Sequence, residues 1–248
     1  FVLYLPIIAG YWLWRHPVLP PGAAFVVAGS GLIKAAYSLL LQRGYQTGDF
    51  SLIYPLARGT GPLLSTMAAI LLFGERPTAL AITGGLIIVG SVFYLTGGTS
   101  LMHQSRIHLR NAVFFGFATG TCIAGYTLWD QRAMSHMRLS PLLYDFGTCV
   151  TMLLLLTSFA IIRRNEVGRE WREHRRHAAI IAVLGPVGYV LILTAMSFTP
   201  VSYIAPAREI SIVIGAFFGV KLLKETDAKR RLIAAGGMLI GIISLALG

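Results

Sequence analysis

The sequence is poor in charged residues and in cysteine for a chain of 248 residues. Charged side chains make up 12% of it, about half the share in an ordinary soluble domain, whereas apolar residues make up 55%. With a mean hydropathy of +0.69, this scarcity excludes a soluble globular domain and indicates a polytopic membrane protein. Cys122 and Cys149 both lie inside apolar runs, so we interpret them as packing residues rather than as a disulfide or metal pair.

The motifs of nucleotide hydrolysis and of enzyme catalysis are missing as well. No phosphate-binding loop of the form GxxxxGK[ST] occurs, so nothing in the sequence points to ATP hydrolysis. The six histidines are scattered over loops rather than clustered with Asp or Ser, and we therefore expect no enzyme and no cofactor. His174 and His177 have a spacing seen in metal sites, but no carboxylate or thiol is fixed beside them, and we expect no metal.

Acidic residues are scarcer than basic ones. Ten Asp and Glu stand against 21 Lys and Arg, which gives a net charge of +11. The basic residues are spread over short loops between apolar spans rather than along one face, which favours anchoring to anionic lipid over binding of nucleic acid. We therefore expect a lipid bilayer, and no nucleic acid, as the partner of this charge.

The rest of the chain is organised around an internal repeat. Residues 51–75 read SLIYPLARGTGPLLSTMAAILLFGE, and residues 201–225 read VSYIAPAREISIVIGAFFGVKLLKE, at an offset of 150 positions. Without a gap, Ala57 coincides with Ala207, Arg58 with Arg208 and Glu75 with Glu225. A repeat of this length indicates a duplicated architecture.

Runs of about 20 apolar residues predict an all-helical membrane protein. The predicted spans are a partial one at 1–14 and then 22–41, 50–73, 78–97, 112–130, 142–162, 178–197, 201–223 and 231–247. We divide the chain into a first repeat at 1–98, a connecting loop at 99–111 and a second repeat at 112–248. Because the first run is short and begins without Met, we expect that the first repeat lacks its first helix and that each complete repeat has five helices. An odd number of crossings per repeat predicts two inverted repeats.

Loop charges support the inversion. Basic residues are concentrated after the spans that end near 41, 97, 162 and 223, so these loops, including 163–177 and 224–231, are predicted to be cytoplasmic. The run RRNEVGREWREHRRH at 163–177 is interpreted as a solvated loop, with an in-plane helix that places Trp171 at the membrane interface as the alternative.

These features together resemble the EamA family of the drug/metabolite transporter superfamily. The resemblance rests on a ten-helix duplication, a proline and an arginine near the start of the fourth helix of each half, Gly74-Glu75-Arg76 at the end of the first copy, and a Gly-rich last helix in each half. The second copy departs from it at Leu223-Lys224-Glu225. The resemblance implies an inverted-repeat carrier for small metabolites with a central cavity, and both termini in the cytoplasm, whereas the loop charges put the C-terminus outside. It does not imply which solute is carried.

Arg58 and Arg208 are the strongest candidates for binding a solute. Each lies seven residues into a long apolar run, where a guanidinium is costly unless it has a function or a partner. Lys34 lies near the middle of its span and is the third candidate cation, either lining a cavity or held in an ion pair. The hydroxyls of Tyr54 and Tyr203 are candidates for contact with a polar solute. Cations in excess predict a solute that is anionic or carries an anionic group.

Carboxylates are the second group of candidates. Glu209 has three possible roles: pairing with Lys34, pairing with Arg58, or titrating as a proton-coupling site; it cannot share a helix face with its neighbour Arg208. Glu75 and Glu225 end their helices, either as gates or as polar residues that hold the turn into the next helix. Asp130 and Asp145 lie near helix ends, and we interpret them as solvated at the interface. Interior prolines predict broken helices, where carriers build sites, or tolerated kinks.

The sequence therefore predicts a secondary transporter that moves a small organic metabolite by alternating access. Its expected place is the inner, or plasma, membrane of a bacterium, as a multi-pass protein, and a homodimer is left open. Two alternatives remain: an exporter of neutral or cationic amino acids or drugs, and a non-transporting membrane helper protein.

Overall fold

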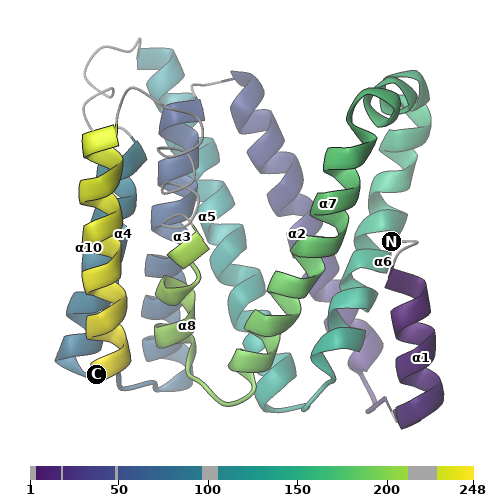
Figure 1. The fold of residues 1–248 in the computed structure, drawn as a ribbon, viewed down its shortest axis with the longest axis horizontal. Coiled ribbons are helices and arrows are strands. Elements are labelled where there is room, and N and C mark those ends of the chain that lie inside the picture. Colours follow the sequence, from purple (N-terminus) through teal and green to yellow (C-terminus); the bar gives the residue numbers. More distant parts are fainter. Residues whose placement is uncertain (1–3, 18, 48–49, 97–105, 212–227) are drawn as a thin grey trace. The chain divides into compact units, whose positions relative to one another are not determined.

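The computed structural model describes residues 4–17, 19–47, 50–96, 106–211 and 228–248, and these residues form helices without any strand (Figure 1). In chain order the helices are α1 (Leu5–Arg15), α2 (Ala23–Thr47), α3 (Phe50–Phe73), α4 (Ala79–Thr96), α5 (Arg106–Ser135), α6 (Pro141–Ile162), α7 (Arg164–Met196), α8 (Val201–Ala207) and α10 (Ala228–Leu247). The all-helical class is thus confirmed for the described ranges. The ten-helix inverted repeat stays a prediction.

The chain divides into two compact units. Unit 1 comprises residues 1–35 and 129–198, and unit 2 comprises residues 36–128 and 199–248. Unit 1 therefore takes one segment from before the predicted connecting loop and one from after it, whereas the first segment of unit 2 contains that loop. The repeats predicted from the sequence, which end at residue 98 and begin again at residue 112, do not coincide with these units, and they stay a prediction.

Unit 1 packs α6 against α7 and α1 against α6. Its helices are joined by buried polar contacts as well as by apolar packing. The indole of Trp129 in α5 donates to the carbonyl of Val26 in α2 over 2.8 Å. At Gly31 of α2, an added Cβ would lie 2.5 Å from the Cβ of Thr151, so a glycine is needed where α2 approaches α6.

Unit 2 is built around the contact of α4 with α10. A Cβ added to Gly84 would lie 2.6 Å from the carbonyl oxygen of Gly241, and one added to Gly241 would lie 2.7 Å from that of Gly84. The two backbones therefore touch at a reciprocal pair of glycines, which is how small residues let membrane helices approach closely. Elsewhere along the same two helices, Val92 and Met238 are fully buried against each other.

The outer surfaces of the helices are apolar. Large side chains such as Leu72, Leu154 and Ile162 are mostly exposed, which a soluble protein would avoid over so many positions. Four helices in the described part of the chain are long and apolar enough to cross a membrane, and they include α6 and α7. The structure thus fits a protein whose solvent is lipid.

Three predicted boundaries are corrected. Residues 106–111 belong to α5 and not to a connecting loop. The run 163–177 is helical from Arg164 onward, so its interpretation as a loop is wrong; that this helix lies in the membrane plane stays a prediction. The span predicted at 201–223 is interrupted, because α8 ends at Ala207 and a turn follows at residues 208 and 209.

Candidate functional site

Asp130 is the centre of a polar cluster in unit 1. Its Oδ1 accepts hydrogen bonds from Ser30 Oγ at 2.5 Å and from the Tyr144 hydroxyl at 2.7 Å, and its Oδ2 accepts one from the Tyr189 hydroxyl. The carboxylate is 0% exposed, so its interpretation as a residue solvated at the interface is wrong. Helix α5 continues to Ser135, which moves Asp130 more than one turn away from the helix end.

Lys34 completes this cluster. Its Nζ lies 3.2 Å from Asp130 Oδ2 and 4.2 Å from the centroid of the Tyr189 ring, and it donates to Thr148 Oγ1 at 3.5 Å. The ammonium is thus neutralised by a carboxylate and covered by an aromatic face. Two roles were predicted for Lys34, lining a cavity or forming an ion pair. The structure supports the ion pair, and Asp130 is the partner. Asp145 is buried as well and accepts from the Tyr4 hydroxyl at 3.1 Å, which corrects its interfacial interpretation.

A second charged cluster lies in unit 2. Arg58 of α3 and Glu209 form an ion pair with 3.7 Å between Nη1 and Oε1, which is longer than a hydrogen bond. Glu209 is buried, and its Oε2 has no hydrogen-bond partner among the residues that the structure describes. The Arg58 side chain is 34% exposed. The contact between the two side chains is therefore a loose one.

Arg208 stands at the break in the helix. Pro206 has no N–H, and the following turn is closed by Arg208 N–H to Ile204 O and by Glu209 N–H to Pro206 O. The guanidinium donates to Thr127 Oγ1 at 3.0 Å and to the Tyr126 hydroxyl at 3.2 Å, both on α5. Arg208 and Glu209 thus contact different helices, in agreement with the roughly 100° between neighbouring helical side chains.

Glu75 makes a contact that sequence reasoning missed. Its two carboxylate oxygens accept from the backbone N–H groups of Val201 and Ser202, each at 2.9 Å. These are amides at the first turn of α8, which lack partners inside the helix and lie at its positive end. Glu75 therefore caps a helix far away in the chain, instead of only holding the turn into α4.

The remaining candidates are less informative. Tyr203 lies beside the apolar cluster of Ala81, Ile88 and Leu245. The side chain of Tyr54 and the whole of Glu225 lie outside the described residues. His174 Nδ1 lies 3.2 Å from a carboxylate oxygen of Glu170. This corrects the statement that no carboxylate is fixed beside His174 and His177. Glu170, Glu173 and His174 are all exposed.

A family comparison decides the class of the protein. The model of the EamA-like transporter family matches residues 110–247, which is more than half of the chain. The chain belongs to the EamA-like transporter family. The resemblance inferred from the repeat is thus confirmed, and the chain is an integral membrane protein of a family that transports small solutes.

The fold comparison agrees with this EamA-like assignment. A protein solved by crystallography superposes with a TM-score of 0.76 at 18% identity, over 97% of this chain and 83% of the solved one. At that identity the likeness concerns the fold alone. No curated protein matches the sequence.

The family match also places the candidate residues. Asp130, Arg208 and Glu209 lie inside the matched range, whereas Lys34, Arg58 and Glu75 lie before it. Each ion cluster thus combines residues from inside and outside the match. The signal that could have found Asp130 is the apolar pair Ala133-Met134 after it, which is fully buried because α5 continues.

Proposed function

We propose that this EamA-like transporter is a secondary carrier for a small organic solute with an anionic group, which Arg58 and Arg208 bind. The observation that carries the proposal is the composition of the unit 2 cluster. It brings two guanidiniums, those of Arg58 and Arg208, close to the single carboxylate of Glu209. Guanidiniums are costly in an apolar helical protein and are the side chains best suited to bind an anionic group.

The geometry of Arg208 suits recognition. Two neutral hydroxyls from α5 hold its guanidinium in place, and they fix its direction without cancelling its charge. The edge-on contact of Tyr37 with Tyr126, at 5.9 Å between ring centroids, steadies one of these hydroxyls. A planar fork that is held in advance can bind a carboxylate, phosphate or phosphonate through two parallel hydrogen bonds.

Arg58 is suited to exchange its partner. The separation of 3.7 Å from Glu209 is too long for a hydrogen bond, and the side chain is partly open to its surroundings. An incoming anion at hydrogen-bonding distance would bind Arg58 more tightly than Glu209 does. The proposal leaves Lys34 out of the solute site, because Asp130 neutralises it within unit 1.

Transport without ATP requires that the solute site opens to one side of the membrane at a time. We attribute this to two inverted halves, as the internal repeat at an offset of 150 predicts. The interruption places Arg208 directly after the end of α8, and broken helices are where many carriers bind their solutes.

The test is a binding screen followed by two conservative variants. The purified protein is heated with succinate, glycerol 3-phosphate, methylphosphonate or a neutral amino acid, since a ligand at 100 times its Kd adds roughly 2.7 kcal/mol of stability. Uptake of the best anion is then measured in proteoliposomes for Arg58→Lys and Arg208→Lys, which keep the charge but lose the fork. We expect at least tenfold weaker binding for Arg208→Lys, with Arg76→Lys, at an exposed arginine, as the control.

If both variants stay folded and transport the anion as the parent does, the anion site is refuted and a neutral or cationic solute becomes the better hypothesis. If the purified protein binds none of the probes and no solute moves, the non-transporting helper gains support.

A further inference from the structure

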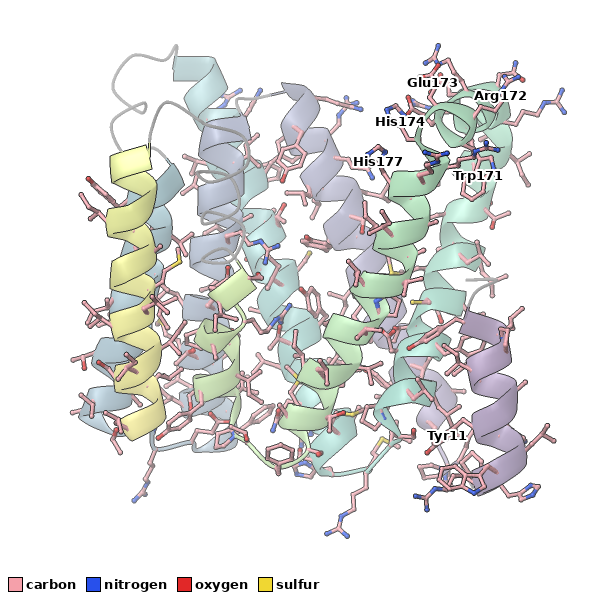
Figure 2. All side chains as sticks on the ribbon, viewed as in Figure 1. Tyr11, Trp171, Arg172, Glu173, His174 and His177 are labelled. Carbon is pink, nitrogen blue, oxygen red and sulfur yellow. The ribbon has the colours of Figure 1, made fainter. Side chains whose placement is uncertain are left out.

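The first part of α7 is a separate surface helix. Residues 178–196 number 19, which is within the roughly 17–25 residues that cross the hydrocarbon core, so residues 164–177 are not needed to span it. The backbone leaves helical geometry at His174, with φ −120° and ψ 15°. Figure 1 shows the start of α7 end-on, whereas α6 and the rest of α7 run across the view. Figure 2 labels Trp171 to His174 at this bend.

The side chains of residues 164–173 separate by charge around this helix. At about 100° per residue, Val167 and Trp171 share one edge. The three arginines fall within an arc of about 140° on one side of that edge, and the three glutamates within about 60° on the other. These residues are Arg164, Arg169 and Arg172, and Glu166, Glu170 and Glu173. A solvated loop or an ordinary surface helix has no reason to sort its charges in this way.

The apolar edge is open, and two of the three glutamates have a basic side chain beside them. Trp171 is 60% exposed and Val167 is 49% exposed. Glu166 pairs with Arg163 at 3.8 Å, and Glu170 pairs with His174 at 3.2 Å. Residues 163–177 together carry six arginines against three glutamates, so the segment is net basic.

We propose that residues 164–173 form an in-plane helix that binds the anionic phospholipid surface of the membrane. Trp171 and Val167 insert at the headgroup level, and Arg164, Arg169 and Arg172 contact lipid phosphates. Lipid is the occupant because the helix is fixed between two membrane helices and begins two residues after the exposed Ile162, where α6 ends. This contact does not depend on the anion site of the carrier.

The test uses the fluorescence of Trp171 in the full-length chain. The protein is reconstituted in phosphatidylcholine vesicles with and without phosphatidylglycerol, and emission is quenched by brominated lipid. Subtraction of the Trp171→Phe spectrum isolates Trp171 from the other three of the four tryptophans. We expect a blue-shifted Trp171 signal that brominated lipid quenches more strongly when phosphatidylglycerol is present, and less strongly at high salt.

Charge variants then identify the side that binds. Each arginine near an anionic surface strengthens the association about fivefold. Quenching of Trp171 should therefore fall to its level in phosphatidylcholine alone in the triple variant Arg164→Gln, Arg169→Gln and Arg172→Gln. The matched control replaces Glu166, Glu170 and Glu173 with Gln and should keep or increase the quenching. If aqueous iodide quenches Trp171 equally in both vesicle types and salt changes nothing, the helix does not bind anionic lipid. That outcome rejects the proposal even where the arginine variant fails to fold.

Discussion

Asp130 in unit 1 and Glu209 in unit 2 are both buried carboxylates that pair with a cation, yet their surroundings differ. Asp130 receives three hydroxyl hydrogen bonds and the ammonium of Lys34, so both of its oxygens are satisfied. Glu209 has one long contact to Arg58 and an oxygen without a hydrogen-bond partner in the described ranges. A saturated carboxylate holds helices together, whereas an under-satisfied one is able to exchange its partner.

This contrast assigns different roles to the two clusters. The donors to Asp130 come from α2, α6 and α7, so one side chain of α5 connects four helices. Buried polar networks of this kind are strong when complete and costly when one member is lost. The unit 2 cluster is incomplete in this sense, which is what a site that must bind and release a solute requires.

The largest effect is expected from Asp130→Asn. The variant leaves the Lys34 ammonium buried without its counter-charge, and breaking a buried pair from one side costs about 3–5 kcal/mol. Thermal unfolding in detergent measures this loss. Combining it with Lys34→Met should restore much of the stability, since the double variant buries no uncompensated charge. A stable Asp130→Asn protein would remove the structural role argued for this cluster.

A loss of stability of intermediate size is expected from Glu75→Ala, because both oxygens of this carboxylate accept hydrogen bonds but the side chain is partly exposed. It makes two charge-assisted bonds to the first turn of α8, so its loss should cost about 2 kcal/mol. Glu75→Gln keeps one acceptor and should lose about half of that amount. The neighbouring Arg76→Ala, at an exposed site, serves as the control and should change stability by less than about 0.5 kcal/mol. Equal losses for Glu75→Ala and Arg76→Ala would contradict the capping role.

Sequence reasoning found one of these clusters and missed the other for a physical reason. The cost of charge in lipid and the repeat both drew attention to Arg58, Arg208 and Glu209. Asp130 was wrongly interpreted as solvated at the interface because hydropathy ended its span at residue 130, whereas the helix continues to Ser135. The partner of Glu75 lies 126 positions away, so no local pattern could reveal it. Helix positions were predictable from hydropathy, but contacts between distant segments required the folded chain.

The smallest change in stability, and the most informative one, is expected from Glu209→Gln. Its contact with Arg58 is long, and the Arg58 side chain is 34% exposed, so the pair should contribute no more than about 1 kcal/mol to folding. In the proposed carrier, Glu209 competes with the solute anion for Arg58. Removing its charge should therefore strengthen anion binding, by up to about fivefold if the whole of that energy is released.

Titration of the best anion from the binding screen, followed by thermal shift, measures this gain. Adding Arg58→Lys to Glu209→Gln should abolish the gain in anion binding. The gain requires the guanidinium of Arg58, which the lysine variant lacks. If Glu209→Gln weakens anion binding instead, the carboxylate orients Arg58 rather than competing with the solute. Glu209 would then resemble Asp130 in role, and the contrast between the two units would not hold.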